Sequence, residues 1–317
     1  MARLYLGIDG GQSSTTALIA DDSGRVIGRG RGGPCNHTGS AEGRTKFLSA
    51  VGTCLEEACR EASLDPSTVS FAAACLGLSG GAEDKEPYAR ELIRSSKFKI
   101  THDAEIALSG ATGGEPGIIV VAGTGSIAFG RNQQGSTARA GGWGYIFGDE
   151  GGAFDLTRRA LRAALQYEEG WGRETGLRKL LLDRTGAADA NELLHRFYTA
   201  DYARTAIAAF APLVTEAAEQ GDQVARGIVN EAAAKLAWFV EGVYRGLFVP
   251  GESVRVAYIG GVFRSSLLLS EFRTQLGTRV ACRIQRPLFH PAAGAVLEAL
   301  RLDRNENPLS SVPASEK

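Results

Sequence analysis

The sequence of 317 residues predicts an α/β protein built from two related lobes. Twice in the chain, a short apolar strand runs into a turn of glycines and hydroxyl residues. The first instance is the strand 4–9 with the turn 10–16, and the second is the strand 118–121 with the turn 123–126. A second strand, a polar corner and a third strand follow each turn. The length also favours two lobes, because one hydrophobic core rarely serves so long a chain.

Both turns have the composition of a phosphate-binding loop that works without a lysine. Small residues let the backbone turn sharply and bring N–H groups and hydroxyls close to a ligand. No Gly-Lys pair occurs in the chain, so it has no Walker loop. A Gly-x-Gly-x-x-Gly match at 28–33 is followed by Pro-Cys-Asn-His rather than by a helix, and it therefore lacks the context of a dinucleotide fingerprint. Two phosphate-type turns predict one bound nucleotide.

Composition narrows the class of partner. The 35 basic and 36 acidic residues give a formal net charge of −1, which offers no bulk attraction for nucleic acid or for an anionic membrane. The apolar runs fall short of the ~20 residues that span a bilayer. Five cysteines form neither close pairs nor zinc-ligand spacing, which favours a reducing cytoplasm. Because the N-terminus already reads as a strand, we expect no signal peptide.

Hydrophobic periodicity predicts the elements of the first lobe in order. We expect three strands over 3–30, a helix over about 47–62, a buried strand over 69–78, a charged helix over about 83–96, a short strand over 97–101 and a brief helix over 104–111. The segment 112–117 has three glycines and one proline and predicts the lobe boundary.

The second lobe is expected to begin with the strands of 117–140. A glycine-rich loop over 141–152, a long helical region over 153–248, a strand over 254–261, a helix from Ser265, a strand over 278–284 and a closing helix over 290–300 should follow. We therefore assign residues 1–114, with the closing helix 291–302, to an N-terminal lobe and residues 115–290 to a C-terminal lobe. The polar tail 303–317 is expected to be disordered.

Two carboxylates, Asp9 and Asp103, end strands at turns, which is where α/β proteins place their chemistry. Asp9 lies beside the first phosphate-type turn and can hold Mg²⁺ through water. Alternatively, it caps its own turn. Asp103 can act as a base toward a substrate hydroxyl that is aligned with a terminal phosphate. Alternatively, it caps the helix that follows.

Three further places can bind a ligand. Asp149 lies in the glycine-rich loop and can accept two hydroxyl hydrogens of a polyhydroxylated ligand, or it can be an ordinary acidic residue at a helix N-terminus. Asn36 and His37 can contact hydroxyls or merely form a turn. Gly260-Gly261 can accept the flat face of an adenine or serve as a strand-to-helix turn.

Taken together, these segments resemble the acetate and sugar kinase/heat-shock-70/actin superfamily. Within it they are similar to the N-acetylglucosamine kinase-like members of the BadF/BadG/BcrA/BcrD ATPase family. The resemblance rests on motifs that arrive in family order between residue 4 and about residue 300. They are residues 7–15 (Gly-Ile-Asp-Gly-Gly-Gln-Ser-Ser-Thr), Asn36-His37, 101–104 (Thr-His-Asp-Ala), 122–126 (Ala-Gly-Thr-Gly-Ser), 141–144 with 148–151, and 259–261.

The resemblance implies two ribonuclease-H-like lobes of the actin/hexokinase type around a nucleotide cleft, with ATP and Mg²⁺ as cofactors. Asp9 would organise Mg²⁺, and Asp103 would be the general base on the sugar 6-hydroxyl. Phosphates would be held by Gly10, Gly11, Gln12, Ser13, Ser14 and Thr15 and by the turn Gly123 to Ser126, and adenosine by Gly260, Gly261 and Ser265. The sugar would be bound by Asn36, His37, Gly125, Ser126, Gly142, Trp143, Gly144 and Asp149.

The implied function is phosphorylation of a small-molecule amino sugar at its 6-hydroxyl by ATP, in a cytoplasmic homodimer. N-acetylglucosamine is the expected acceptor. Glucosamine and N-acetylmuramic acid stay open, because Ile127 stands where the vertebrate-type enzyme carries an asparagine.

Two other classes compete with the kinase. An ATPase activator of an anaerobic dehydratase or reductase would need cysteine ligands for a [4Fe–4S] cluster, but no cysteine occurs between Cys75 and Cys282. A non-catalytic sugar sensor is expected to have lost its base or its phosphate turn, whereas Asp9, Asp103 and Thr124 are all present.

Overall fold

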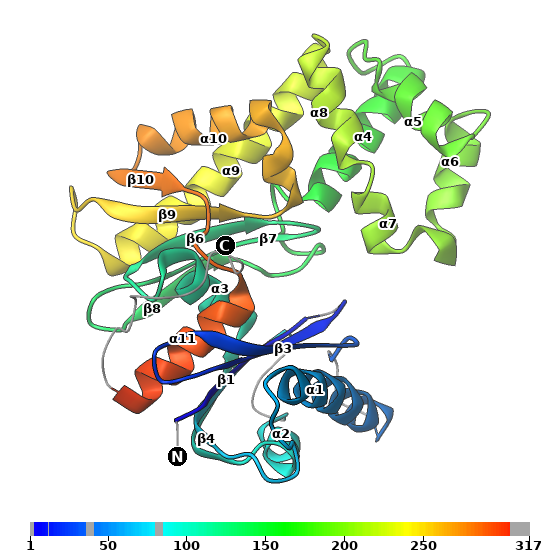
Figure 1. Cartoon of the computed structure of the whole chain (residues 1–317). Coiled ribbons are helices and arrows are strands. Elements are labelled where there is room, and N and C mark those ends of the chain that lie inside the picture. Colours follow the sequence, from blue (N-terminus) through cyan, green and yellow to red (C-terminus); the bar gives the residue numbers. More distant parts are fainter. Residues whose placement is uncertain (1–2, 12, 36–40, 80–84, 305–317) are drawn as a thin grey trace. The chain divides into compact units, whose positions relative to one another are not determined.

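The computed structural model describes residues 3–11, 13–35, 41–79 and 85–304 (Figure 1). By its contacts the chain divides into two compact units. The first contains residues 1–117 and 286–317, and the second contains residues 118–285. Each unit has its own five-stranded sheet and its own hydrophobic cores.

The sheet of the first unit combines a meander with two crossover strands. In spatial order its strands are β3 (Val26–Gly32), β2 (Thr15–Ala20), β1 (Tyr5–Gly10), β4 (Phe71–Leu78) and β5 (Ser95–His102). The first three pair antiparallel, whereas β4 and β5 run parallel to β1. The carboxyl ends of β1, β4 and β5 therefore lie at the same edge of the sheet.

Helices cover both faces of this sheet because successive strand residues point to opposite sides. Leu6 and Ile8 pack toward α1 (Ala41–Glu61) and α2 (Glu86–Leu92), whereas Tyr5 packs toward α3 (Asp103–Thr112) and α11 (Pro291–Arg304). A Cβ on Gly7 would lie 2.4 Å from the Val296 nitrogen, so α11 rests directly on β1.

The second sheet repeats this plan. Its spatial order is β10 (Cys282–Gln285), β9 (Val254–Ile259), β6 (Gly117–Ala122), β7 (Ser126–Arg131) and β8 (Thr137–Gly141). Strands β9 and β10 run parallel to each other, and β9 runs parallel to β6. We number the strands by their place within each unit and read the first sheet from β3 and the second sheet from β8. Both sheets then have the order third, second, first, fourth, fifth. The repeated strand-and-turn pattern in the sequence thus corresponds to a repeated topology.

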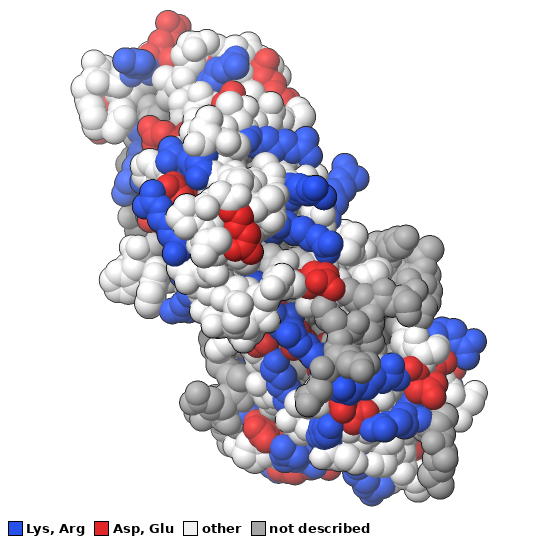
Figure 2. Space-filling view, turned by 90° about the vertical axis from the view of Figure 1, so that its left-hand side faces the viewer, with Lys and Arg blue, Asp and Glu red and all other residues white. Residues whose placement is uncertain are grey.

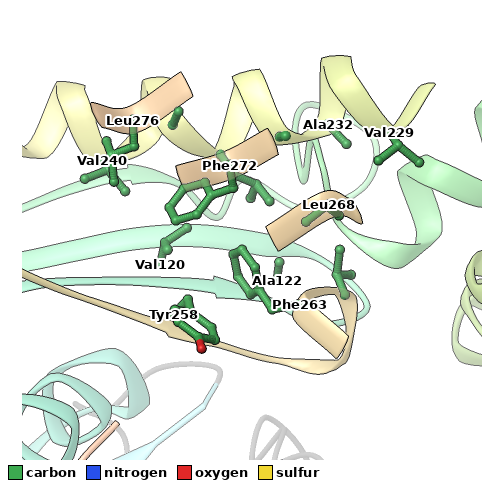
Figure 3. Packing of buried hydrophobic residues seen from close by; sticks show 14 of the residues in the cluster. Val120, Ala122, Val229, Ala232, Val240, Tyr258, Phe263, Leu268, Phe272 and Leu276 are labelled. Atoms are coloured by element: carbon green, nitrogen blue, oxygen red, sulfur yellow. The ribbon is translucent and has the colours of Figure 1, made fainter. Parts of the chain in front are cut away.

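Two helices, α9 (Gln223–Leu247) and α10 (Ser266–Gly277), cover one face of the second sheet (Figure 3). Asp222 caps α9 by accepting from the Val224 and Ala225 nitrogens, and Ser265 caps α10 by accepting from the Leu268 nitrogen. The side chains of this core are apolar and fully or almost fully buried, and Figure 3 labels Val120, Ala122, Val229, Ala232, Val240, Tyr258, Phe263, Leu268, Phe272 and Leu276.

The expected helical region 153–248 consists of several helices. Besides α9, they are α4 (Ala153–Glu168), α5 (Leu177–Thr185), α6 (Ala190–Phe197), the 3₁₀ turn η2 (Ala200–Tyr202), α7 (Arg204–Ala208) and α8 (Ala211–Glu219). A small core of its own, which includes Leu181 and Leu193, holds the outer helices together.

Three predicted elements have clearly different bounds. The helix expected over about 47–62 begins earlier, at Ala41. The helix expected over 83–96 ends at Leu92, because Ser95 already pairs with Phe71 in the sheet. The strand expected over 278–284 begins only at Cys282, where pairing with Val254 starts. Between residues 260 and 266 a short 3₁₀ turn, η3 (Gly261–Arg264), precedes α10. Most of the tail expected to be disordered, from residue 305 on, lies outside the described residues.

Charged side chains of both signs are interspersed on the face shown in Figure 2, as the near-balance of 35 basic and 36 acidic residues leads one to expect. Among the described residues, the structure contains no helix with the length and apolar character of a membrane span.

Candidate active site

Asp9 and Asp103 lie at the same edge of the first sheet. Asp9 is opposite Gly77 of β4, and the next residue of β4, Leu78, is opposite His102, which precedes Asp103. Burial, and then the negative charge of Asp103, raise the pKa of Asp9 to about 6. The carboxylate of Asp9 is therefore within electrostatic reach of Asp103, and a cation at this edge would stabilise both.

Asp103 occupies the first turn of α3 rather than the capping position. The N-cap residue is His102, and its side chain makes no capping hydrogen bond. The Oδ1 atom of Asp103 accepts from the Ala104 nitrogen at 2.8 Å, and the side chain is exposed. The position suits a base that meets a ligand from solvent.

The first phosphate-type turn is tightly built. A Cβ on Gly10 would lie 2.5 Å from both Cys35 Sγ and Leu78 Cδ2, so only glycine fits there. The Gly11 nitrogen donates to the Ser14 oxygen at 3.0 Å. Thr15 is buried, and its hydroxyl donates to the Gly33 oxygen at 2.8 Å. The exposed hydroxyls of this turn accordingly belong to Ser13 and Ser14.

Backbone hydrogen bonds hold the second turn in place, and the space beside Gly123 is open. The Gly123 nitrogen donates to the Gly125 oxygen at 3.0 Å. Nitrogens at the start of α4 bind the carbonyls of Gly123 and Thr124 at 2.8 and 3.1 Å. A Cβ on Gly123 would meet nothing within 4 Å, which leaves room for a ligand. Gly260, with φ +113°, lies against the end of β6, where a Cβ would be 2.2 Å from the Ala122 oxygen.

A cavity of about 700 Å³ opens beside this second turn, wholly within the second unit. Four residues predicted to bind the nucleotide line it together: Gly123, Thr124, Gly261 and Ser265. Its volume is that of a typical small-molecule site. The remaining walls come from α4, from α7 and the residue after it, and from α8, η3 and the start of α10. They comprise Ala153, Leu156, Thr205, Ala208, Ala209, Ala211, Pro212, Thr215, Glu219, Val262, Arg264 and Ser266. No sequence motif indicated the α7 and α8 wall, since its small residues are ordinary for helices.

Asp149 lies at the centre of a second cluster. Its backbone has a positive φ of +65°, and its side chain is buried. One carboxylate oxygen accepts from the Ser126 nitrogen at 3.3 Å, and the other forms an ion pair with Arg204. A Cβ on Gly125 would lie 2.3 Å from Asp149 Oδ2. Three predicted sugar-binding residues, Gly125, Ser126 and Asp149, are thus in direct contact.

The glycine-rich loop joins this cluster through its backbone. The Gly142 nitrogen donates to the Ser126 oxygen at 2.9 Å, and Gly142 and Gly144 both have positive φ. Trp143 between them is 65% exposed, with the Arg139 guanidinium 4.6 Å from its ring centroid. Arg204 also lies over the Tyr145 ring, at 5.1 Å. Sequence reasoning missed Arg204, because nothing near it in the chain marks it as a partner of Asp149.

Three of the predicted site residues, Gln12, Asn36 and His37, lie outside the described residues. Within the described part of the chain, His, Cys, Asp and Glu side chains do not gather in groups of three or more that suit a metal ion. The Asp9 edge nevertheless fits Mg²⁺, which usually takes one or two carboxylates and completes its shell with phosphate and water.

Two sheets of one strand order, each with a glycine turn after its first strand, define a two-lobed α/β protein of the actin/hexokinase type. The model of the BadF/BadG/BcrA/BcrD ATPase family matches residues 6–299, and the chain belongs to this family. The predicted family and fold class are confirmed.

Individual relatives cover most of the chain. It is 35% identical to an N-acetylmuramic acid/N-acetylglucosamine kinase from Clostridium acetobutylicum, over 86% of this chain and 89% of that protein. It is 28% identical to an N-acetyl-D-glucosamine kinase from Dictyostelium discoideum, over 94% and 98%. Among solved structures, a candidate N-acetylglucosamine kinase from Chromobacterium violaceum matches with a TM-score of 0.71 and 28% identity, over 93% of this chain and 98% of that one.

Proposed function

We propose that the protein transfers the terminal phosphoryl group of ATP to the 6-hydroxyl of an amino sugar, with N-acetylglucosamine as the first candidate. One observation carries the proposal: Asp9 and Asp103 share the carboxyl edge of one sheet, close enough for the charge of Asp103 to raise the pKa of Asp9. Phosphoryl transfer to an alcohol uses a carboxylate that binds a metal ion and a second carboxylate that acts as the base.

In this proposal Asp103 is the general base. Its exposed carboxylate takes the proton of the sugar hydroxyl while that oxygen bonds to the terminal phosphorus of ATP. The bond from this phosphorus to the bridging oxygen breaks, and ADP leaves. Asp9 would hold Mg²⁺, whose charge stabilises the phosphates.

The nucleotide has a site of suitable size in the second unit. The open turn at Gly123 and Thr124 offers small residues to phosphates, and the cavity that begins there is large enough for an adenosine. The small side chains of Ala208, Ala209 and Gly261 leave flat apolar surface for a base. The names of the relatives, all kinases, support ATP as the donor.

The cluster around Asp149 is the proposed sugar site. Its carboxylate is fixed by Arg204 and Ser126, and Trp143 offers an exposed ring beside it in the same loop. Ile127 lies against Gly142, where a Cβ would be 2.7 Å from Ile127 Cδ1. An apolar side chain at this wall suits the methyl of an N-acetyl group better than a free ammonium, which favours N-acetylglucosamine over glucosamine.

The buried cysteines favour a kinase over an iron–sulfur activator. Cys35, Cys54, Cys59 and Cys75 are at most 1% exposed and pack within the cores of the first unit. Their thiols are used as small apolar groups.

The remaining parts of the proposal concern organisation. We propose residues 1–114 with helix 291–302 as one functional lobe, residues 115–290 as the other, and a cytoplasmic homodimer as the active form. Light scattering on the purified protein would show a mass of twice 33.4 kDa for a dimer.

A coupled ADP-release assay across a panel of sugars tests the function. We expect turnover with N-acetylglucosamine, slower turnover with glucosamine, and none with a 6-deoxy analogue, which lacks the acceptor oxygen. ADP release that is equal with and without every amino sugar would contradict the proposal.

A further inference from the structure

Three charged side chains form ion pairs with one another on the strand and helices next to Asp103. The proposed mechanism gives them no role. Lys99 of β5 places its Nζ atom 2.7 Å from Glu105 Oε1 of α3 and 2.9 Å from Glu298 Oε2 of α11. The Glu298 side chain is 3% exposed, and that of Glu105 is 18% exposed. Burial alone would lower the pKa of Lys99, but Glu298 and Glu105 outweigh it and raise the pKa, so the lysine is charged.

Two hydroxyls also belong to this group. The Thr101 Oγ1 atom donates to Glu105 Oε2, and the Ser109 Oγ atom donates to Glu298 Oε1. The first bond joins the residue two before Asp103 to the residue two after it. The strand-to-helix corner that carries Asp103 is therefore closed by Thr101 and Glu105, and Lys99 ties it to Glu298 on the last helix.

The packing of α11 against α3 does not require these charges. A Cβ on Gly294 of α11 would lie 1.9 Å from the Ile106 oxygen, so α11 and α3 already touch backbone to backbone. The Phe289 nitrogen, just before α11, also donates to the Gly110 oxygen at 3.0 Å. A buried ion pair is usually no more stabilising than apolar groups of the same volume. A half-buried lysine that holds one buried and one partly buried carboxylate is better explained by the geometry that it imposes.

We propose that Lys99, Glu105 and Glu298 form a positioning network that fixes the Asp103 carboxylate for proton abstraction. The inference rests on the proposed kinase function and extends it to the last helix. Glu298 is a positioning residue, since it contacts Lys99 and Ser109 and reaches the corner through them. Misplacement of a reacting group by about 1 Å can slow a reaction about 100-fold, which sets the size of the effect.

Asp303 provides a matched control on the same helix. Its carboxylate accepts from Tyr5 Oη at 2.9 Å and pairs with Arg3 and with Lys97, at 3.4 Å for Lys97. It thus anchors α11 by the same kind of bond, to the same sheet, without contacting the corner at Asp103. Glu298→Gln and Asp303→Asn each remove one carboxylate charge from α11.

The test compares kcat, KM and thermal stability of these variants with N-acetylglucosamine and ATP. We expect Glu298→Gln to lower kcat about 10- to 100-fold, with both KM values changed less than about threefold. Asp303→Asn should lower the Tm at least as much and leave kcat within about twofold of the wild type. Thr101→Val removes the bond that closes the corner and should lower kcat, which gives a second measurement if Glu298→Gln does not fold.

A double variant that combines Glu298→Gln with Asp103→Asn distinguishes a positioning role of Glu298 from a general loss of structure. If Glu298 acts through Asp103, adding Glu298→Gln to Asp103→Asn should cause almost no further loss of kcat. An equal loss in both backgrounds, or equal losses for Glu298→Gln and Asp303→Asn, would overturn the network. A wild-type protein that phosphorylates amino sugars while Glu298→Gln and Thr101→Val keep full kcat overturns the network alone. A wild-type protein inactive on every amino sugar overturns the function and the network with it.

Discussion

The two sheets share one strand order, but the edges that carry their glycine turns differ in chemistry. In the first unit, Asp9 is the last residue but one of β1, and β5 leads into Asp103. In the second unit, Val121 has the place in β6 that Asp9 has in β1, since each is the fifth residue of a six-residue strand. The first edge supplies negative charge and the second supplies an open cavity. The two units therefore share a topology but differ in the function proposed for their sheet edges.

The two units also differ in the space around the glycines of these segments. Gly10 is enclosed by Cys35 and Leu78, whereas Gly123 faces open volume. At the end of β1, packing against the core requires glycine at position 10, whereas a Cβ on Gly11 would meet only the Ser14 oxygen, at 3.3 Å. The second turn is glycine-rich because a ligand has to come close. These differences can be tested by variants in the two units.

The largest expected effect is on the base. Asp103→Asn should lower kcat about 10²- to 10⁴-fold, because the amide keeps the shape of the side chain but cannot take a proton. Nucleotide affinity measured by calorimetry should be nearly unchanged, since the proposed nucleotide cavity lies in the second unit. Unchanged turnover would remove Asp103 from the mechanism.

Asp9→Asn should have two opposite consequences. Turnover should fall by about 10²-fold or more through loss of the Mg²⁺ ligand. The ligand-free protein, however, should become more stable above pH 6. The pKa of Asp9 is raised from 3.8 to about 6 in the folded state, so ionisation disfavours folding as the pH rises through this range.

The gain in free energy of unfolding should be about 1 to 3 kcal/mol at pH 8 and should vanish below about pH 4. Denaturant titrations at the two pH values measure it. If Asp9→Asn were destabilised to the same degree at both pH values, burial and the charge of Asp103 would not raise the pKa of Asp9.

One glycine variant in each unit tests the two reasons for glycine. Gly123→Ala should keep its Tm and raise the KM for ATP about tenfold, because the methyl occupies volume assigned to phosphate. Gly10→Ala should lower the free energy of unfolding by about 1 to 3 kcal/mol, since its methyl overlaps Cys35 and Leu78. Thermal melts and initial rates distinguish the two outcomes. A destabilised Gly123→Ala with normal KM would reverse the roles given to the turns.

The smallest effect is expected at Arg204. Arg204→Gln removes the partner of a buried carboxylate and should raise the sugar KM a few-fold while lowering stability by about 1 to 2 kcal/mol. Arg245→Gln is the control, because Arg245 pairs with the Glu241 carboxylate of α9 in the same unit, and neither residue is assigned to the sugar. Equal sugar KM values for the two variants would show that Arg204 does not orient Asp149 for the sugar.

Much of the fold could be predicted from local patterns. The strands at 5–10 and 117–122 with their turns, and the closing helix, lie close to their expected positions. The helix expected over 83–96 was too long, because Ser95 and Ser96 have no strong strand signal and are extended only through pairing with β4. The candidate site was predicted in part: the contacts among Gly125, Ser126 and Asp149 agree with their expected grouping, while their sugar-binding role stays a prediction.

By itself, the sequence determined the elements whose cause is local: alternation of apolar residues makes the strands, and glycines with hydroxyl residues make the turns. The tertiary structure decided the partners and the charge states. It placed Arg204 on Asp149, tied Glu298 to the corner of Asp103 through Lys99, and raised the pKa of Asp9. These properties depend on groups from different elements that fold into contact, and the energy of a buried charge is set by such neighbours rather than by its place in the chain.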